Sequence, residues 1–278
     1  MTTGALIFAF NNADIDYVEM SAWSAHRIKK YLNIPVAVVT NSTTATQYAS
    51  FDQVINTELT WDGHHRYFTD LDKSVPWYNA NRVDAYQLTP WDKTLVLDAD
   101  YVVNSTSLSS VLKCNEEFMC YRHAQDVRSV DNWDLNYFGT CNFPMWWATV
   151  MMFQKSPMAQ HIFNSMSMIR NNWQHYRDLY GITQSQYRND YALSISLGLV
   201  SGHTLTTTNI AGSILTLTPE VELTAGNQPN EFNITWQDIL GKRKRGQLVD
   251  CDFHAMGKKQ LGGIIEADRR AGLFNTSH

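Results

Sequence analysis

The stretch Thr94-Leu95-Val96-Leu97-Asp98-Ala99-Asp100-Tyr101-Val102-Val103 is a short apolar run interrupted by two carboxylates one residue apart. A run of this length, rich in branched apolar side chains and preceded by Pro90 and Asp92, predicts a strand buried on both faces. Asp98 and Asp100 would then lie where the strand leaves the sheet, which is where open α/β sheets bind ligands. Two neighbouring carboxylates repel each other unless a cation lies between them, and hard divalent cations take oxygen ligands.

The Asp-x-Asp spacing by itself is not specific. It recurs at Asp14-Ile15-Asp16, Asp70-Leu71-Asp72 and Asp250-Cys251-Asp252. Only the pair at 98 and 100 directly follows a clear buried strand. Two interpretations therefore stay open from this stretch alone, a metal site and a polar strand end in a loop.

Composition describes a globular protein large enough for a sizeable core. The chain has 278 residues, of which 44% are hydrophobic and 18% charged, so extended disorder is not expected. The formal net charge of −5 gives no global basic field that would attract nucleic acid or membrane. Cys114, Cys120, Cys141 and Cys251 have no CxxC spacing and predict free thiols in a reducing compartment.

The chain shows neither a convincing signal peptide nor a transmembrane segment. The N-terminus lacks a basic region and a long apolar segment, and no stretch reaches the length of a membrane-spanning helix. We therefore expect a cytoplasmic protein.

The first third of the chain alternates between strand and helix patterns, which predicts a parallel, doubly wound sheet. No Gly-x-Gly-x-x-Gly or Walker loop is present, which argues against a dinucleotide enzyme or an NTPase. The expected strands are Ala5–Phe10, Val36–Val39 and a segment near Val54-Ile55, and the expected helices are Tyr17–Leu32 and Pro76–Leu88.

The pattern changes after Asp100. Strands are expected at Glu117–Tyr121, Thr149–Phe153 and Leu248–Phe253, and a long amphipathic helix at Pro157–Tyr180. No linker divides the chain, so we expect a single domain. Aromatic side chains are concentrated in a predicted loop that contains Trp133, Tyr137, Phe138, Trp146 and Trp147.

This order of elements resembles the sugar-nucleotide glycosyltransferases of GT-A architecture, with the nearest likeness to the retaining family 8 group. Leu97-Asp98-Ala99-Asp100 matches the family's acidic motif, and His254-Ala255-Met256-Gly257-Lys258 approximates its terminal His-Phe-x-Gly-x-x-Lys, shorter by two residues before the lysine. Arg82 fits the arginine on the helix before the acidic strand, and Ala148–Phe153 loosely matches a later apolar strand. Asn189-Asp190-Tyr191 is a partial match to an Asp-Gln-Asp-like segment, which leaves the catalytic assignment open.

The resemblance implies a mixed central sheet flanked by helices in one domain, residues 1–278. Residues 1–104 would form the nucleotide-sugar-binding half, and residues 105–278 the acceptor half with a C-terminal metal and phosphate segment. It also implies a metal-dependent enzyme that moves a sugar from a nucleoside-diphosphate donor, expected to be a UDP-sugar, to a hydroxyl group.

Asp98, Asp100 and His254 are the expected metal ligands, and two carboxylates with an imidazole favour Mn²⁺, with Mg²⁺ as the alternative. The ion would act as a Lewis acid on the leaving diphosphate. Asp190, with Asn189, is the candidate near the anomeric carbon; the alternative is an ordinary acidic residue at a helix N-terminus. The expected donor-binding residues are Phe10, Asn11, Asn12, Tyr17, Thr40, Asn41, Arg82, Ala99, Gly257 and Lys258.

Several of these donor-site residues also have a purely structural interpretation. Asn12 is explained equally well as a helix cap. Arg82 is explained by a surface ion pair, and Lys258 by a solvated pair with Lys259.

The acceptor is predicted from the basic run Lys242-Arg243-Lys244-Arg245, which suits a phosphate backbone but is also typical of a solvated loop. Together with His64-His65-Arg66-Tyr67 and the aromatic loop it would form a surface that holds an unstacked base. The chain also resembles, more faintly, tailed-phage enzymes that glycosylate hydroxylated or hydroxymethylated pyrimidines in DNA, which would place it in the host cytoplasm. The alternatives are a glycan, lipid or protein acceptor, a nucleotidyltransferase or metal hydrolase, and a non-catalytic nucleotide-sugar-binding module.

Overall fold

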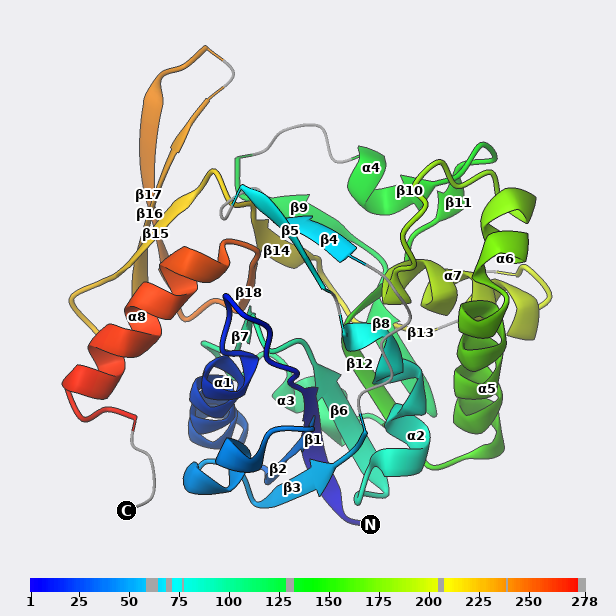
Figure 1. Ribbon diagram of the computed structural model, residues 1–278, viewed down its shortest axis with the longest axis horizontal. Coiled ribbons are helices and arrows are strands. Elements are labelled where there is room, and N and C mark those ends of the chain that lie inside the picture. The colour runs from blue at the N-terminus through cyan, green and yellow to red at the C-terminus, as the bar shows by residue number, and fades with distance from the viewer. Residues whose placement is uncertain are drawn as a thin grey trace.

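A mixed sheet forms the centre of the molecule, with helices on both faces (Figure 1). Strands β6, β1, β2 and β3 are parallel, and β12 runs antiparallel between β6 and β8. The predicted α/β class with a mixed central sheet flanked by helices is confirmed. The computed structural model describes residues 1–58, 65–68, 72–76, 78–128, 133–204, 208–238 and 240–274. In spatial order the strands of the central sheet are β13 (Thr208–Asn209), β8 (Phe118–Tyr121), β12 (Trp147–Gln154), β6 (Lys93–Leu97), β1 (Thr3–Phe8), β2 (Val36–Thr40) and β3 (Gln53–Asn56).

The central strands are buried on both faces, as their continuous apolar sequences predict. In β1, Ala5 and Ile7 belong to one apolar cluster, and Leu6 and Phe8 belong to another on the opposite face. Strand β6 is buried along its whole length. Because each large buried apolar side chain contributes about 1.5–3 kcal/mol, these strands anchor the edge at which Asp98 lies.

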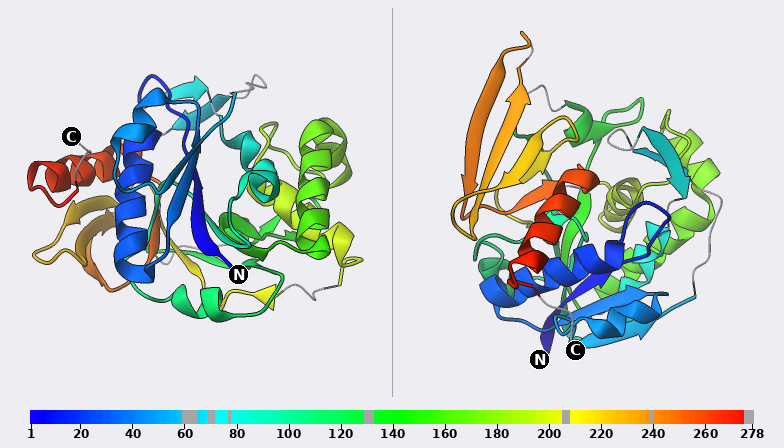
Figure 2. Two further views of the ribbon diagram at one scale, coloured as in Figure 1. Left: turned by 90° about the horizontal axis from the view of Figure 1, so that it is seen from below. Right: turned by 60° about the vertical axis from the view of Figure 1, so that its left-hand side comes forward.

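The helices divide between the two faces of the sheet (Figure 2). Helix α1 packs on β1 and β2 with α8 beside it, and α5 and α7 pack together on the side of β12. Trp23 of α1 donates its indole N–H to Asp268 of α8 at 2.8 Å, which ties the first helix to the last. The α-helices are α1 (Tyr17–Leu32), α2 (Ala85–Leu88), α3 (Ser109–Lys113), α4 (Trp133–Asn136), α5 (Pro157–Asn171), α6 (Trp173–Leu179), α7 (Asn189–Val200) and α8 (Lys258–Arg270); η1 (Thr43–Gln47) and η2 (Asn79–Asp84) are 3₁₀ helices.

The smaller sheets flank the carboxyl edge of the central sheet. One contains β7 (Tyr101–Val102), β18 (Phe253–Ala255), β14 (Ile214–Leu217) and β9 (Ala124–Asp126), in that order. A second, β15 (Glu222–Ala225), β16 (Glu231–Gln237) and β17 (Arg243–Val249), projects from the body at the upper left of Figure 1. Two short hairpins complete the described strands, β4 (His65–Phe68) with β5 (Lys73–Pro76) and β10 (Tyr137–Phe138) with β11 (Phe143–Pro144).

Two predicted helices differ from the structure. The single helix expected over Pro157–Tyr180 is two helices, because it breaks at Asn172, whose backbone leaves the helical conformation at φ −121° and ψ 34°. The helix expected over Pro76–Leu88 is shorter, because Pro76 ends a strand and the helical part begins as the 3₁₀ turn η2.

The C-terminal strand predicted over Leu248–Phe253 is also wrong. Strand β17 ends at Val249, and β18 begins at Phe253 in a different sheet. Asp250 between them has a φ of 48°, and the Asp252 carboxylate accepts a hydrogen bond from the Asn104 amide at 2.7 Å. The turn and this anchor direct the chain toward β7.

No helix within the described segments is long and apolar enough to cross a membrane. Cys114, Cys120, Cys141 and Cys251 are all free thiols, in agreement with the prediction from their spacing.

Candidate metal and donor site

Asp98 and Asp100 lie in the turn that connects the central sheet to the small sheet of β7. The Asp98 amide still donates to Thr149 of the neighbouring strand at 3.0 Å, and the Tyr101 amide then donates back to the Asp98 carbonyl at 3.1 Å. The chain therefore leaves β6, turns over three residues and enters β7. This places both carboxylates at the carboxyl edge of the buried strand, where the sequence predicts them.

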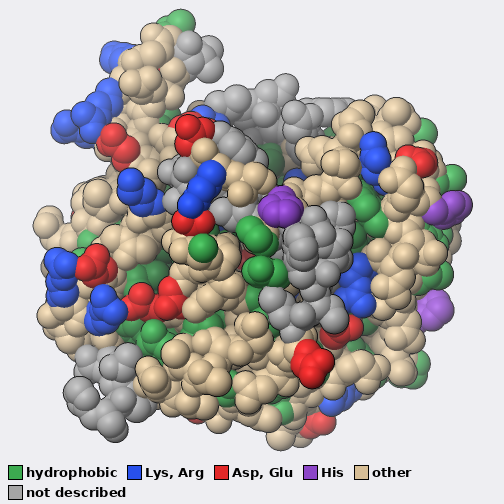
Figure 3. Space-filling view, in the orientation of Figure 1, with side chains coloured by type: hydrophobic (Ala, Val, Ile, Leu, Met, Phe, Trp, Pro, Cys, Tyr) green, Lys and Arg blue, Asp and Glu red, His purple; other side chains and the backbone are tan. Residues whose placement is uncertain are grey.

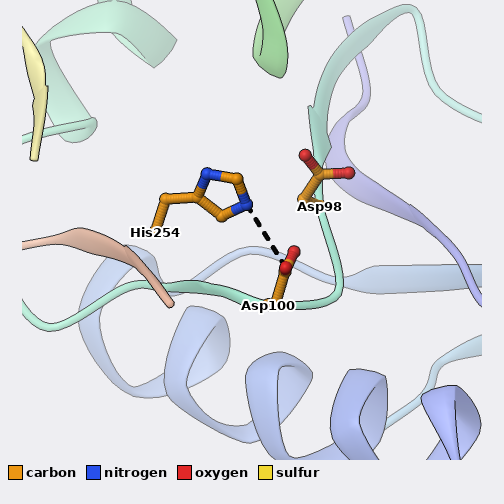
Figure 4. Close-up of side chains that lie close together, drawn as sticks. All are labelled: Asp98, Asp100 and His254. Atoms are coloured by element: carbon orange, nitrogen blue, oxygen red, sulfur yellow. Dashed lines mark hydrogen bonds and ion pairs between the residues drawn. The ribbon is translucent and has the colours of Figure 1, made fainter. Parts of the chain in front are cut away.

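Pairing between β7 and β18 brings His254 to the same place. His254 lies opposite Tyr101 in the antiparallel pair, and the Ala255 amide donates to the Asp100 carbonyl at 3.0 Å. The His254 Nε2 atom lies 3.2 Å from Asp100 Oδ2, and ligand atoms of Asp98, Asp100 and His254 all lie within 4.8 Å of one another (Figure 4).

The three side chains fit a divalent cation in chemistry and nearly in size. Ligands on adjacent corners of an octahedron with bonds of about 2.1 Å lie about 3.0 Å apart, and ligands on opposite corners about 4.2 Å apart. The 3.2 Å between His254 and Asp100 matches the first distance. All three ligand atoms lie within 4.8 Å of one another, so a modest approach of the side chains would bring them to these separations.

Two cations of the chain itself hold the carboxylates. Arg82 of η2 donates to Asp98 Oδ1 and, at 2.8 Å, to the Ala148 carbonyl, and its side chain is only 3% exposed. Burial alone would raise the pKa of Asp98, but Arg82, assisted by His254 and Lys258, holds the pKa below its usual value. Arg82 is therefore a buried partner of the site and not half of a surface ion pair.

Lys258, the first residue of α8, contacts Asp100 in the same way. Its ammonium donates to Asp100 Oδ2, the oxygen nearest His254 Nε2, and also to the Ala255 carbonyl at 3.3 Å. The Lys258 and Asp100 side chains are 9% and 10% exposed. Lys258 is thus buried inside the carboxylate cluster, unlike the solvated lysine that was the structural alternative.

Asp190 is linked to this cluster through one residue of strand β12, Ala148. Its Oδ1 accepts from the Ala148 amide at 3.0 Å, and the Ala148 carbonyl accepts from Arg82. Asp190 and Arg82 therefore hold the same strand residue by its two backbone groups. Asn189 differs, because its side chain is buried and accepts from the Tyr187 hydroxyl at 3.3 Å.

Arg188 is a candidate site residue that the sequence analysis did not identify. It donates to Asp190 Oδ2 at 2.8 Å, and its guanidinium lies 5.9 Å from the centre of the Trp147 ring and 5.2 Å from that of Tyr191. Burial lowers the pKa of Arg188, but Asp190 and Tyr191 outweigh burial and raise it above its usual value. Its position beside Asp190 in sequence was the available signal, but an arginine two residues from an acid is too common to be diagnostic.

The two asparagines that follow β1 accept hydrogen bonds from nearby backbone amides. Asn11 Oδ1 accepts from the Val18 amide at 2.9 Å in the first turn of α1, and Asn12 Oδ1 accepts from the amides of Asp14 and Ile15 at 2.9 Å each. Asn11 thus accepts from an amide of the helix, whereas Asn12 closes the turn before it and is not the helix cap that was its structural alternative, because Asp16 is the N-cap of α1. Phe10 is buried at 5% exposure, and Tyr17 packs against the core.

The remaining predicted donor residues lie around the same edge of the sheet. Thr40 is buried and accepts from the Ser42 amide at 3.1 Å, and the carbonyl of buried Ala99 accepts from the Ser24 hydroxyl at 2.9 Å. Gly257 caps α8 directly before Lys258. Asn41 lines an open pocket of about 530 Å³ at the ends of β2 and β3, together with Thr43, Thr46, Asn56, Thr57 and Glu58.

Most of the basic run lies in a strand, and Lys242 directly precedes it. Arg243 to Arg245 open strand β17, at the outer edge of the projecting sheet, and blue side chains gather on this arm in Figure 3. Arg243 pairs with Glu222 at 2.8 Å, and Lys244 lies 3.5 Å from Asp238. Own-chain carboxylates thus offset part of the positive charge.

The expected aromatic surface is wrong in its main members. Phe138, Trp146 and Trp147 are buried, at 7%, 6% and 5% exposure, because they fill the core around β12 and α7. They are not available to stack on a base. The side chain of Trp133, His64, and the side chains of Arg66 and Tyr67 lie outside the described part of the chain.

No family model and no curated protein matches the sequence. Among solved structures, the chain is similar to galactosyltransferase LgtC in complex with donor and acceptor sugar analogues, at 14% identity over 70% of each chain and a TM-score of 0.48. It is also similar to the glycosyltransferase GlyE of Streptococcus pneumoniae, at 11% identity over 75% of this chain and 45% of that one, with a TM-score of 0.40. The bifunctional glycosyltransferase WbbM matches 60% of this chain and 34% of its own at 13% identity, with a TM-score of 0.37.

Proposed function

We propose that this protein is a metal-dependent glycosyltransferase that takes a sugar from a nucleoside-diphosphate donor, with UDP as the expected nucleotide. The observation that carries the proposal is the convergence of Asp98, Asp100 and His254 within 4.8 Å at the carboxyl edge of the sheet. The two buried cations at this cluster, Arg82 and Lys258, provide further positive charge where a diphosphate would lie.

In this proposal, Asp98, Asp100 and His254 hold Mn²⁺ or Mg²⁺, which supplies Lewis-acid stabilisation of the leaving diphosphate. Lys258 donates to phosphate oxygens as the glycosidic bond breaks, because a charge-assisted hydrogen bond strengthens as negative charge accumulates. Arg82 orients the Asp98 carboxylate and fixes the Ala148 backbone. Residues 1–104 would contribute most of the donor side, and residues 105–278 the acceptor side with the C-terminal metal and phosphate segment.

Asp190 is the proposed residue at the anomeric carbon. Arg188 pairs with this side chain at 2.8 Å and orients it, and a carboxylate so placed can stabilise an oxocarbenium-like centre or attack it. Asn189 supports the start of α7 beside it.

Metal-dependent release of the nucleoside diphosphate from a panel of sugar nucleotides tests the proposal. We expect turnover with Mn²⁺, none with EDTA, and loss of turnover in Asp98→Asn and Asp100→Asn, while Asp178→Asn on the exposed surface of α6 behaves as wild type. Full turnover in both site variants would contradict the proposal. Release of pyrophosphate would instead indicate a nucleotidyltransferase, and diphosphate binding without turnover a non-catalytic binding module.

For the acceptor, a hydroxylated or hydroxymethylated pyrimidine in DNA is the first candidate, and a glycan, lipid or protein hydroxyl is the alternative. Support for DNA comes from Lys242, directly before the edge strand β17, and from Arg243, Lys244 and Arg245 at the start of that strand on the projecting arm. Changing these four residues to Ser should weaken DNA binding and flatten its salt dependence without affecting donor hydrolysis. Unchanged DNA affinity would remove nucleic acid as the acceptor.

A further inference from the structure

The carboxylates of the candidate metal site are already neutralised by side chains of the chain itself. Arg82 donates to Asp98, and Lys258 donates to Asp100. Two negative charges thus face two positive charges, and all four side chains are less than one fifth exposed. Unpaired carboxylates buried together would be costly, so these cations stabilise the cluster.

Lys258 competes directly for the position that a metal ion needs. Its ammonium and the His254 Nε2 atom approach the same oxygen, Asp100 Oδ2. An ion bound to this oxygen would have to share it with the ammonium. The ion and the ammonium would also repel each other strongly in this poorly solvated place.

The contacts of the two carboxylates agree with this competition. Each carboxylate is held by its own cation, Asp98 by Arg82 and Asp100 by Lys258. Contraction around a metal ion therefore requires at least one of these contacts to loosen.

We propose that Lys258 is an internal counter-cation that occupies the Asp100 side of the metal site and moves to the diphosphate when metal and donor bind together. Lys258 then weakens binding of the metal alone and strengthens binding of the nucleotide. A divalent ion added to a neutral cluster leaves excess positive charge, which a diphosphate removes. Metal and donor must therefore bind cooperatively, and the coupling is reciprocal. This inference rests on the proposed function for the identity of the second ligand.

The test is calorimetric titration of the full chain with Mn²⁺ alone and then with UDP at saturating Mn²⁺. The variants are Lys258→Met and Lys258→Gln, of which the second keeps a hydrogen-bond donor for Asp100 if the first does not fold. Lys259→Met, at the exposed neighbouring position of α8, is the matched control. We expect Mn²⁺ alone to bind about tenfold more tightly or better in both Lys258 variants, because one unit of repulsion is removed.

In the same variants, UDP should bind about tenfold to a hundredfold more weakly at saturating Mn²⁺, because a charge-assisted contact is lost. Tighter Mn²⁺ binding together with weaker UDP binding in the same variant is what we expect of a side chain that leaves Asp100 for the diphosphate. Unchanged or weaker Mn²⁺ binding in the Lys258 variants would overturn the inference and leave the proposed function intact. A wild-type chain that binds no Mn²⁺ even with UDP present would instead contradict the proposed function.

Discussion

The Arg82–Asp98 pair yields a prediction whose magnitude follows from its burial. The Arg82 side chain is 3% exposed and that of Asp98 17%. Replacing Arg82 by Met leaves the Asp98 carboxylate without its cation, and breaking a buried ion pair in this way costs about 3–5 kcal/mol. Since water can still reach Asp98, we expect the lower end, about 3 kcal/mol.

A double-mutant cycle separates this charge effect from the other contacts of Arg82. Arg82→Met also loses the hydrogen bond to the Ala148 carbonyl, but this loss occurs equally in the Asp98→Asn background and cancels. In that background Arg82→Met should therefore destabilise by about 2 kcal/mol less, because no buried charge is left behind.

The free energy of unfolding is measured by urea titration followed by circular dichroism, with EDTA present so that no metal ion replaces the lost cation. Wild type, the two single variants and the double variant complete the cycle. Equal destabilisation by Arg82→Met in both backgrounds would refute the reasoning, because it would show that Arg82 acts through packing or through Ala148 and not through the Asp98 charge.

Three further predictions concern catalysis, the arm and the core. Asp190→Asn should lower donor turnover at least about hundredfold and leave the UDP affinity within about twofold, because the proposed role begins only as the glycosidic bond breaks. Steady-state kinetics measures the turnover, and calorimetry measures the UDP affinity. Turnover equal to that of wild type would remove Asp190 from the mechanism. The Asp238 carboxylate accepts from the amides of Lys242 and Leu240 at 2.9 Å and 3.0 Å, which lowers the pKa of Asp238 below 3.8. The stability that Asp238 gives to this turn is therefore fully present above the unfolded-state pKa, and it is lost as pH falls through the lower folded-state pKa. An NMR titration of the Asp238 carboxyl carbon should give a midpoint below 3.8. A midpoint at or above 3.8 would contradict the turn geometry. Leu97→Ala, in fully buried β6, should destabilise by about 2–5 kcal/mol in the same urea assay, and a cost under about 1 kcal/mol would show that this strand is not the packed centre of the sheet.

Local sequence patterns predicted the elements that have strong local causes. Helix α1 begins and ends where its periodicity predicts, because Asp16 caps its start and Asn33 adopts a left-handed conformation at its end. Strands β1, β2 and β6 were predictable because a continuous apolar run can be satisfied only by burial on both faces. The break at Asn172 was missed, because the periodicity of α5 continues across it.

The candidate site divides in the same way. Asp98 and Asp100 could be identified from the buried strand that precedes them. The proximity of His254 could be expected only from a family resemblance, since no local pattern relates a residue near the C-terminus to one near position 100. The paths of the arm and of the aromatic side chains were not predictable either, because a tryptophan-rich segment packs inside the core or on a surface depending on its neighbours.

The order of apolar runs, caps and breaks along the chain is enough to specify a parallel core and to place two carboxylates at its edge, because these features depend on neighbours a few residues apart. Which cations meet those carboxylates depends on strand pairing and helix packing between segments 66 to 158 residues apart. Lys258 reaches Asp100 only because β18 pairs with β7, and Arg82 meets Asp98 only because the Ala148 carbonyl of β12 holds its guanidinium. Each of these buried charged side chains meets its partner only when the sheets assemble.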